Sequence, residues 1–459
     1  METTSDSAWT RFQEAVKDGE RGFVDRLLKY LSWPTISAQN VGIREGAQVL
    51  CEAMTRASLK AEIIETPFHP VVVGKSAMVT GRRTILWYGH YDVQPAEPLD
   101  QWVTPPFEPR ERDGRIYARG AGDNKGQHFA FLMALETLAA MGESALCNII
   151  MVVDGEEEIG SPGLPSFVQK HAELLGQADL VVVADGSMHP SGNPLIQFGV
   201  RGVVAFELKA SGANRDLHSG NFGNVAPNPA WDIVHLLSTM KNSHGDITVE
   251  GLHDAVVAPT EAEEAAMKRI PLDVDSILKG LDLERLDEPQ ELSYFHRLMF
   301  RPTLTINGLS SGYSGEGAKT IIPATATAKC DIRLVNAQEP EHVLRCLKAH
   351  VRKHAPNVTL VRSFEMAPAK TPMDSPIAMR LSRAIEKVHG KEPYLYPTVG
   401  GSLLTSVFSK DLGLPTFVVP YANHDQRNHS PNENICVKNF LDGIKTSAAI
   451  LMELAKTDE

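Results

Sequence analysis

Short apolar segments that run directly into acids or histidines constrain the fold of this chain more than any other feature. Four short apolar segments read as buried strands: residues 71–73, 84–88, 148–153 and 179–184, of which the last three run into acids or histidines. Two stretches between them, residues 126–141 and 164–175, carry apolar residues at helical spacing. Alternating strands and helices predict an α/β domain with a mostly parallel central sheet flanked by helices.

The pattern changes after about residue 200. Apolar and polar residues alternate, as in half-exposed antiparallel strands, in three segments: residues 200–212, 303–308 and 325–335. Two helices are expected at residues 228–240 and 339–353. The first pattern returns near residue 373, with a helix at 377–389 and a strand at 416–420. We therefore expect a discontinuous first domain and an inserted α+β domain. The first domain comprises residues 1–200 and 372–459, and the inserted domain comprises residues 201–371.

Composition supports two domains and excludes some partners. A chain of 459 residues with 42% hydrophobic content exceeds what one core usually supports. The formal net charge of −12 argues against nucleic acid and anionic membrane as partners. No signal peptide or membrane span is recognisable, so a cytoplasmic location is expected. The five cysteines lack metal-binding spacing and fit reduced structural thiols.

Side chains that bind metals follow the predicted strands. The strand 84–88 runs into His90 and Asp92, and 148–153 runs into three consecutive glutamates. Asp185 follows the next strand, and two histidines at 424 and 429 follow the last one. Ligands bind at the carboxyl ends of strands in open α/β sheets, so these loops should converge. A glycine-rich turn before helix 126–141 should bring Asp123 to the same edge.

Histidines and carboxylates together suit a divalent metal. Each residue alone also has an ordinary explanation, such as a turn, a helix cap or a buried histidine. Five coincidences at strand ends favour a metal centre, and five ligands exceed what one tetrahedral zinc needs. Two metals that share a carboxylate are therefore expected. Such cations would also explain the acidic run GEEE, which alone reads as a solvated turn.

Five motifs in this order, GHYDVQP, RGAGDNKG, DGEEEIGS, VVVADGS and HSPNE, resemble the co-catalytic di-zinc peptidases, and in particular the dipeptidase branch that includes carnosinase and glutamate carboxypeptidase. The resemblance spans nearly the whole chain. Three further motifs, DLHSG, GEGAKTIIP and DIRLV, resemble the lid and dimerisation domain of that branch. The resemblance implies a homodimeric hydrolase that cuts dipeptides or small peptides with a free C-terminal carboxylate.

Two other functions remain open. An N-acyl or N-carbamoyl amino acid amidohydrolase would use the same site, because a fold does not determine a substrate. A catalytically inactive relative ranks third, because every ligand type and the general base are present. The pair Thr398 and Val399 stands where dipeptidases carry Arg-Glu, which removes two charges near the expected amine or leaving-group pocket. Substrate specificity could differ for that reason.

The resemblance also implies a role for each residue of the metal centre. It implies these metal ligands: His90 and Asp185 on one zinc, Glu158 and His429 on the other, and Asp123 as the bridge. Asp92 would hold the imidazole of His90. Glu157 would be the general base that activates water, and Glu156 would be a spare surface acid. Zinc is the expected metal, with manganese and cobalt as alternatives.

Substrate contacts follow from the resemblance as well. His218, from the lid of the partner protomer, would steady the oxyanion, with Thr320 contributing there. Arg333 would clamp the substrate carboxylate with its planar, permanently charged guanidinium. Gly401 and Ser402 would hold the same end of the substrate. Without the flanking motifs, His218 would read as a turn residue and Arg333 as a solvent-facing strand residue.

Overall fold

The computed structural model describes residues 4–143, 146–287 and 292–456. The chain forms two compact units. Unit 1 comprises Met1–Gly199, Thr371–Pro397 and Val407–Glu459, and unit 2 comprises Val200–Lys370 and Thr398–Ser406. Among the helices of the described ranges, none is long and apolar enough to cross a membrane.

The centre of unit 1 is an eight-stranded sheet with the order β1-β2-β6-β3-β7-β18-β8-β17. Its strands are β1 (Lys60–Ile64), β2 (Val71–Lys75), β3 (Thr84–His90), β6 (Asn148–Asp154), β7 (Leu180–Val183), β8 (Leu195–Gln197), β17 (Tyr394–Tyr396) and β18 (Thr416–Val418). The pairs β6–β3, β3–β7, β7–β18 and β8–β17 are parallel. Antiparallel pairing occurs at β1–β2, β2–β6 and β18–β8. The expected α/β class with a mostly parallel sheet is confirmed.

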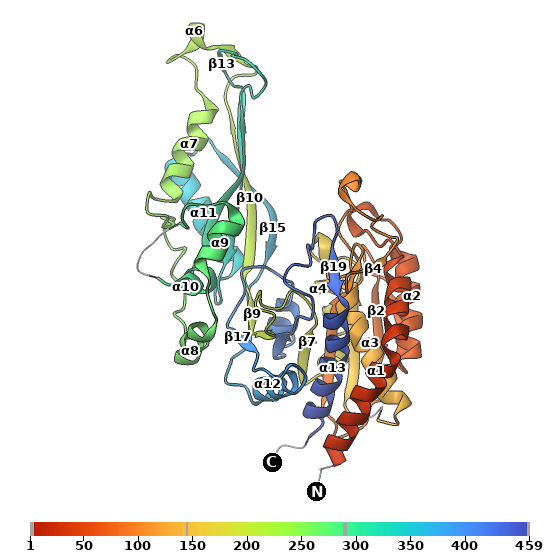
Figure 1. Cartoon of the computed structure of the whole chain (residues 1–459). Helices are drawn as coiled ribbons and strands as arrows, with labels where there is room; N and C mark the ends of the chain where they lie inside the picture. The colour runs from red at the N-terminus through yellow and green to blue at the C-terminus, as the bar shows by residue number, and fades with distance from the viewer. Residues whose placement is uncertain (1–3, 144–145, 288–291, 457–459) are drawn as a thin grey trace. The chain divides into compact units, whose positions relative to one another are not determined.

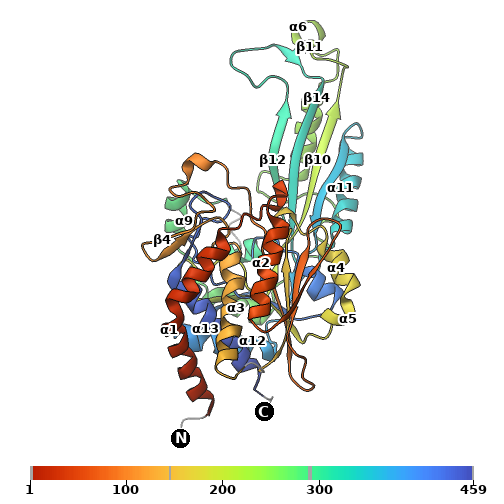
Figure 2. The ribbon, with the colours of Figure 1, turned by 90° about the vertical axis from the view of Figure 1, so that its right-hand side faces the viewer.

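Helices cover this sheet, and five of them lie side by side (Figures 1 and 2). They are α1 (Thr4–Leu31), α2 (Ile43–Arg56), α3 (Lys125–Ala140), α12 (Pro376–His389) and α13 (Val437–Leu454). Helix α3 is apolar around most of its circumference because it is buried on most sides. Its Phe131 stacks on Trp87 of β3, with 3.8 Å between ring centroids. The helix expected at 164–175 is instead two, α4 (Leu164–Lys170) and α5 (Ala172–Leu175), because the backbone leaves helical geometry at His171.

Small elements complete unit 1. They are β4 (Arg110–Arg112), β5 (Arg115–Tyr117), β19 (Asn434–Cys436), the 3-10 helices at Ser37–Gln39, Leu99–Gln101 and Glu157–Ile159, and a π-helix at Val407–Asp411. Strand β19 pairs with β5. This pairing ties the loop that follows β18 to the segment that leads into the glycine-rich turn.

Unit 2 is built on a four-stranded antiparallel sheet with the order β12-β14-β10-β15. Its strands are β10 (Gly202–Ser211), β12 (Thr303–Ser311), β14 (Thr325–Leu334) and β15 (Thr359–Met366). Alternate residues of β10 and β14 are buried in one core with α7 (Pro229–Met240) and α11 (Pro340–His354). The remaining elements are β9 (Gly199–Val200), β11 (Leu217–His218), β13 (Ile321–Ile322), β16 (Ala369–Lys370), α6 (Ser219–Phe222), α8 (Glu261–Arg269), α9 (Val274–Leu281) and α10 (Tyr294–Phe300). Figure 2 shows β12, β14 and β10 running side by side.

Candidate metal centre

Parallel strands of unit 1 end at one edge of the sheet and place the predicted ligands there. His90 is the last residue of β3 and lies opposite Asp154, the last residue of β6, in the parallel register. Glu157 and Glu158 follow β6 on a 3-10 helix, and Asp185 follows β7 by two residues. The convergence predicted for strand ends is therefore what the structure has.

The ligand atoms form two groups that share Asp123. One group contains His90, Asp123 and Asp185, the other contains Asp123, Glu158 and His429, and within each group the atoms lie within 4.8 Å of one another. Asp123 Oδ1 lies 3.1 Å from His90 Nε2, whereas its Oδ2 lies 3.2 Å from His429 Nε2. Each oxygen of this carboxylate thus faces a different histidine. This is the geometry of a bridging ligand between two cations.

Burial and mutual repulsion shift the pKa values of these clustered carboxylates. Burial and the charge of Asp123 raise the pKa of Glu158 to about 7 and that of Asp185 to about 6. Asp123 is also buried, but hydrogen bonds from His429 and His90 hold its pKa well below the usual range. For His429 the bonds to Asp123 and Glu158 raise the pKa to about 10. The two histidines here take the positive role that metal ions would take.

The donor set fits two divalent metals. It combines imidazole nitrogens with carboxylate oxygens, the mixture that zinc, manganese and cobalt accept. Buried carboxylates gathered this closely need compensating positive charge, and no lysine or arginine of the described chain forms an ion pair with a ligand carboxylate. The two ligand groups therefore fit two divalent metals, whichever element they are.

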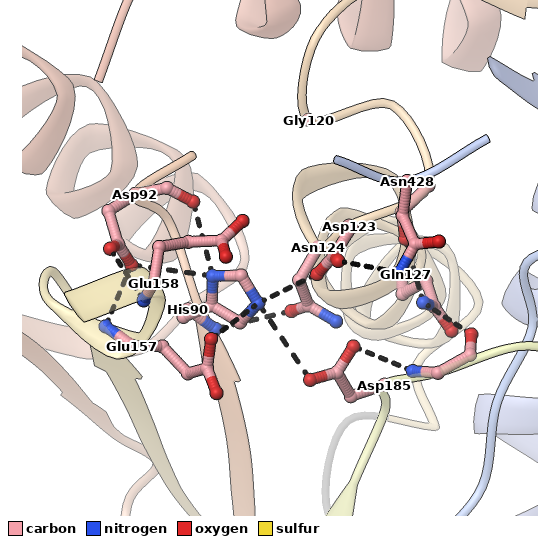
Figure 3. A network of polar contacts seen from close by, with 12 residues as sticks. His90, Asp92, Gly120, Asp123, Asn124, Gln127, Glu157, Glu158, Asp185 and Asn428 are labelled. Carbon is pink, nitrogen blue, oxygen red and sulfur yellow. Dashed lines mark hydrogen bonds and ion pairs between the residues drawn. The ribbon is translucent and has the colours of Figure 1, made fainter. Parts of the chain in front are cut away.

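Asp92 holds the ligands in place through several contacts. Its Oδ1 lies 3.3 Å from Nδ1 of His90, and its backbone carbonyl lies 3.1 Å from the same nitrogen. The carboxylate also accepts the backbone N–H groups of Glu157, at 3.1 Å, and Glu158, at 3.0 Å. Figure 3 shows His90 between Asp92 on one side and Asp123 and Asp185 on the other. Asp92 therefore links the loops after β3 and β6.

Glu157 stands beside the ligands and belongs to neither group found among the described residues. Its Oε2 lies 3.9 Å from His90 Nε2. Burial, opposed by the charge of His90, raises the pKa of Glu157 well above the usual value for a glutamate, and the acids around it add to this rise. A carboxylate with a raised pKa beside a metal centre suits proton transfer.

The interpretation of Glu156 as a surface acid is wrong. Its side chain is fully buried, and it accepts the backbone N–H groups of Gly163 and His69. These bonds close the turn after the 3-10 helix that carries Glu157 and Glu158. Only two of the three consecutive glutamates therefore face the centre, and the first anchors their loop.

Sequence reasoning also missed Glu433, the last residue of the HSPNE motif. Its carboxylate accepts the backbone N–H groups of Gly120, Gly122 and Asp123, at 3.0–3.1 Å. Arg119 donates to Glu433 Oε2 at 2.8 Å, and both side chains are buried. Glu433 thereby shapes the turn that presents the bridging ligand. An acid at the end of a ligand motif was the available signal.

Amide side chains complete the surroundings of the ligands. Asn428 donates to Asp123 Oδ2 at 3.2 Å, and Gln94 donates to Glu158 Oε2 at 2.9 Å. Asn124, buried at the start of α3, accepts the backbone N–H of His90 at 3.2 Å. Figure 3 shows Asn428 close to Asp123. Neither Asn428 nor Gln94 was singled out from the sequence, because an amide carries no charge signal.

The predicted substrate residues of unit 2 fall into two places. His218 is exposed on β11 and pairs with Ile321 of β13, and the backbone N–H of Ser219 donates to the Thr320 carbonyl at 3.1 Å. Arg333 of β14 donates through Nη1 to Ser402 Oγ at 2.9 Å. Gly401, beside Ser402, accepts the backbone N–H of Arg201. The structure therefore brings His218 together with Thr320, and Arg333 together with Ser402.

Paired ligand groups with an adjacent carboxylate, on a mostly parallel sheet, define a metal-dependent hydrolase. A family model described as "Peptidase family M20/M25/M40" matches residues 86–453. The Cys-Gly metallodipeptidase dug1 of Schizosaccharomyces pombe is 31% identical, over 97% of this chain and 98% of its own length. The human Beta-Ala-His dipeptidase is 30% identical, over 85% of this chain and 78% of its own.

Solved structures agree with these relatives. The metallo-carboxypeptidase Sso-CP2 from Sulfolobus solfataricus has a TM-score of 0.89 at 33% identity and covers 94% of this chain and 99% of its own. Human carnosine dipeptidase 1 has a TM-score of 0.83 at 27% identity and covers 97% and 98%. The chain belongs to peptidase family M20/M25/M40, and the resemblance inferred from the motifs is confirmed.

Proposed function

We propose that this protein is a dipeptidase that uses two divalent metal ions to cleave dipeptides or small peptides with a free C-terminal carboxylate. The observation that carries the proposal is the position of Asp123 between two ligand groups, with Glu157 beside His90 of the first group. The relatives named Cys-Gly metallodipeptidase and Beta-Ala-His dipeptidase support dipeptides as the substrate class.

In this proposal the ligands divide as the two groups do. They hold the ions as follows: His90 and Asp185 bind one, Glu158 and His429 bind the other, and Asp123 binds both. When bound, two divalent cations supply Lewis-acid chemistry, because they polarise an amide carbonyl and acidify water. Asp92 orients the imidazole of His90 and the backbone of the glutamate loop.

Glu157 is the proton carrier of the proposed reaction. Its carboxylate takes a proton from the attacking water and delivers it to the nitrogen of the leaving amine. A raised pKa suits both halves of that task, because the group must first accept and then release a proton near neutral pH. No covalent intermediate with the protein is required.

Substrate binding is assigned to unit 2. Arg333, held by Ser402, binds the C-terminal carboxylate, with Gly401 on the same loop. His218 of a partner subunit, with Thr320, steadies the negative charge that develops on the carbonyl oxygen. Unit 1 is then the catalytic domain, and unit 2 is a lid and dimerisation domain. Unit 2 comprises Val200–Lys370, close to the expected residues 201–371, and also Thr398–Ser406, which were expected in the catalytic domain.

Three finer properties belong to the same proposal. Zinc is the working metal, the protein is a homodimer through unit 2, and the location is the cytoplasm. The five cysteines, all within the described ranges, are free, which supports a reducing compartment. Neither nucleic acid nor membrane is a proposed partner, because the net charge of −12 disfavours both.

Hydrolysis of a matched panel tests the proposal. The metal-loaded protein is given free dipeptides, the same dipeptides with amidated carboxyl ends, and N-acetyl or N-carbamoyl amino acids. Cleavage of the free dipeptides alone is the expected result. Cleavage restricted to the acylated amino acids would assign the protein to the amidohydrolases instead.

A further inference from the structure

One face of the unit 2 sheet carries a pocket that the catalytic proposal uses only in part. In β10 and β14, one set of alternate residues packs against α7 and α11, and the other set faces away from these helices. On the second face Val203 pairs with both Arg333 and Met366. A cavity of about 330 Å³ lies there, with polar walls from Asn307, Asp331, Arg333 and Ser402 and apolar walls that include Phe364 and Met366.

An acid in this pocket stands beside the arginine proposed to bind the substrate carboxylate. Asp331 Oδ2 lies 3.8 Å from Arg333 Nε, and Asn307 donates to Asp331 Oδ1 at 3.1 Å. The Asp331 side chain is only 15% exposed. A buried carboxylate next to an anion-binding arginine partly cancels its charge, so it weakens anion binding unless another cation is near.

Arg201 is that second cation. Only 7% of it is exposed, its Nε donates to the Gly400 carbonyl at 3.0 Å, and its Nη1 has no hydrogen-bond partner within the described chain. Burial and the charge of Arg333 lower the pKa of Arg201 to about 10, while Asp331 opposes this change. Arg201 also shapes the loop that carries Ser402, because its backbone N–H donates to the Gly401 carbonyl.

The charges of this cluster do not balance. Arg201 and Arg333 bring two positive charges, and Asp331 brings one negative charge. The next charged groups on this face, Glu207 with Lys209 and Lys329, pair among themselves. Arg201 is buried and Asp331 largely so, whereas 34% of the Arg333 side chain is exposed and open to a ligand. A cluster with one unmatched positive charge and an unsatisfied buried N–H group is stabilised when an anionic ligand completes it. One carboxylate does so, and a second would leave the site with excess negative charge.

We propose that Asp331 makes this pocket selective for a single carboxylate, so that the protein prefers substrates whose C-terminal residue has an uncharged side chain over those ending in aspartate or glutamate. This inference rests on the proposed function, in which Arg333 binds the C-terminal carboxylate. The side chain of that residue would then lie near Asp331, where a second carboxylate is repelled.

Binding to a protein that cannot turn over separates this inference from the catalytic proposal. The probes are Ala-Gln and Ala-Glu, which differ in charge and hardly in shape, and binding to the metal-loaded Glu157→Gln protein is measured by calorimetry. Preference for Ala-Gln is expected. Adding Asp331→Asn should reduce that preference by about tenfold, chiefly through tighter binding of Ala-Glu. The same ratio is then read from kcat/KM in the protein with Glu157 intact.

Three variants sharpen the test. Asn307→Asp adds a negative charge at an exposed position beside Asp331 and should increase the preference for Ala-Gln. Arg201→Gln should weaken the binding of both peptides, which would appear as a higher KM with little change in kcat. The control Asp275→Asn, on α9 outside the pocket, should leave the ratio unchanged. The inference would be overturned if the Ala-Gln to Ala-Glu ratio were unchanged in both Asp331→Asn and Asn307→Asp, or if neither peptide bound. Binding without cleavage in the protein with Glu157 intact would overturn the catalytic proposal alone.

Discussion

Glu433 and Arg119 form a buried ion pair, with 2.8 Å between Oε2 and Nη1 and at most 1% of either side chain exposed. The same carboxylate accepts three backbone N–H groups of the turn that presents Asp123. One acid thus serves both folding and the position of the proposed bridging ligand, although it lies in neither candidate ligand group.

The substitution Glu433→Gln should therefore damage stability and metal binding together. Leaving Arg119 buried without its partner costs about 3 kcal/mol or more of unfolding free energy, which urea denaturation measures. Metal content should fall because the Asp123 turn loosens. Arg21→Gln, which breaks the exposed ion pairs of Arg21 with Asp25 and Glu111, is the control and should change stability much less, because water and salt screen exposed ion pairs. Equal effects from the two changes would contradict this role for Glu433.

Metal stoichiometry should distinguish the bridging ligand from a terminal one. Asp123→Asn removes a charge shared by both ligand groups, so the affinity for both ions should fall. Asp185→Asn should lower the affinity for one ion only. Elemental analysis after dialysis counts the ions retained. The control Asp425→Asn, in an acid paired with Arg115 outside both groups, should keep both ions. If Asp123→Asn retains two ions, Asp123 is not the bridge.

Adjacent glutamates should behave differently when each becomes glutamine. Glu157→Gln should keep the metal content while kcat falls by about 10²-fold to 10⁴-fold, because the proton carrier is lost. Glu158→Gln should lose metal first, and its activity should recover in part when metal is added in excess. Activity assays and metal analysis on the same samples show which glutamate carries the proton and which binds metal. Near-normal turnover by Glu157→Gln would reject Glu157 as the base.

Removal of the metal should reverse the way in which the free energy of unfolding depends on pH. In the metal-free fold the pKa of Glu158 is raised to about 7 and that of Asp185 to about 6, above their unfolded values near 4. Between about pH 4 and pH 7 the folded state therefore binds more protons than the unfolded state. The free energy of unfolding falls as the pH rises from about 4 to 7. His429, with its pKa raised to about 10, extends the decline above neutrality.

Thermal unfolding of chelator-treated and metal-loaded protein at pH 5 and pH 8 measures this effect. The chelated protein should be less stable at pH 8 than at pH 5. Metal should stabilise the loaded protein most at pH 8, where few protons compete with the metal ions for the ligand atoms. A chelated protein that is equally stable at both pH values would contradict the expected proton linkage.

His218 tests whether a second subunit completes the site. The side chain is exposed on β11, so His218→Ala should leave folding and metal content unchanged. If a partner subunit's histidine steadies the oxyanion, kcat should fall by about 10²-fold to 10³-fold. The control is His244→Ala, another exposed histidine of unit 2. Light scattering on the same samples reports the oligomeric state, and a fully active monomer would reject the role.

Much of the metal centre could be predicted because its signals are local. His90, Glu158 and Asp185 lie at or just after the ends of apolar strands, where polar residues stand out against the strand. Asp123 lies in a glycine-rich turn, and His429 lies further along the loop after β18. Glu156 shows the limit of this reasoning, because three adjacent acids look alike in the sequence while only the fold determines which ones turn inward. Its burial depends on backbone N–H groups of His69 and Gly163, of which the first lies far away in the chain.

The sequence alone determined the α/β class, the inserted α+β segment and the family, and it named the candidate ligand residues, because strand periodicity and motif spacing are properties of neighbouring residues. Tertiary structure decided which oxygen of Asp123 faces which histidine, that Glu433 and Arg119 support the bridging turn, and that Arg201, Asp331 and Arg333 share one face of a sheet. Those relationships join residues up to 314 positions apart. Their distances arise only when strand register and packing bring the segments together, which no local pattern encodes.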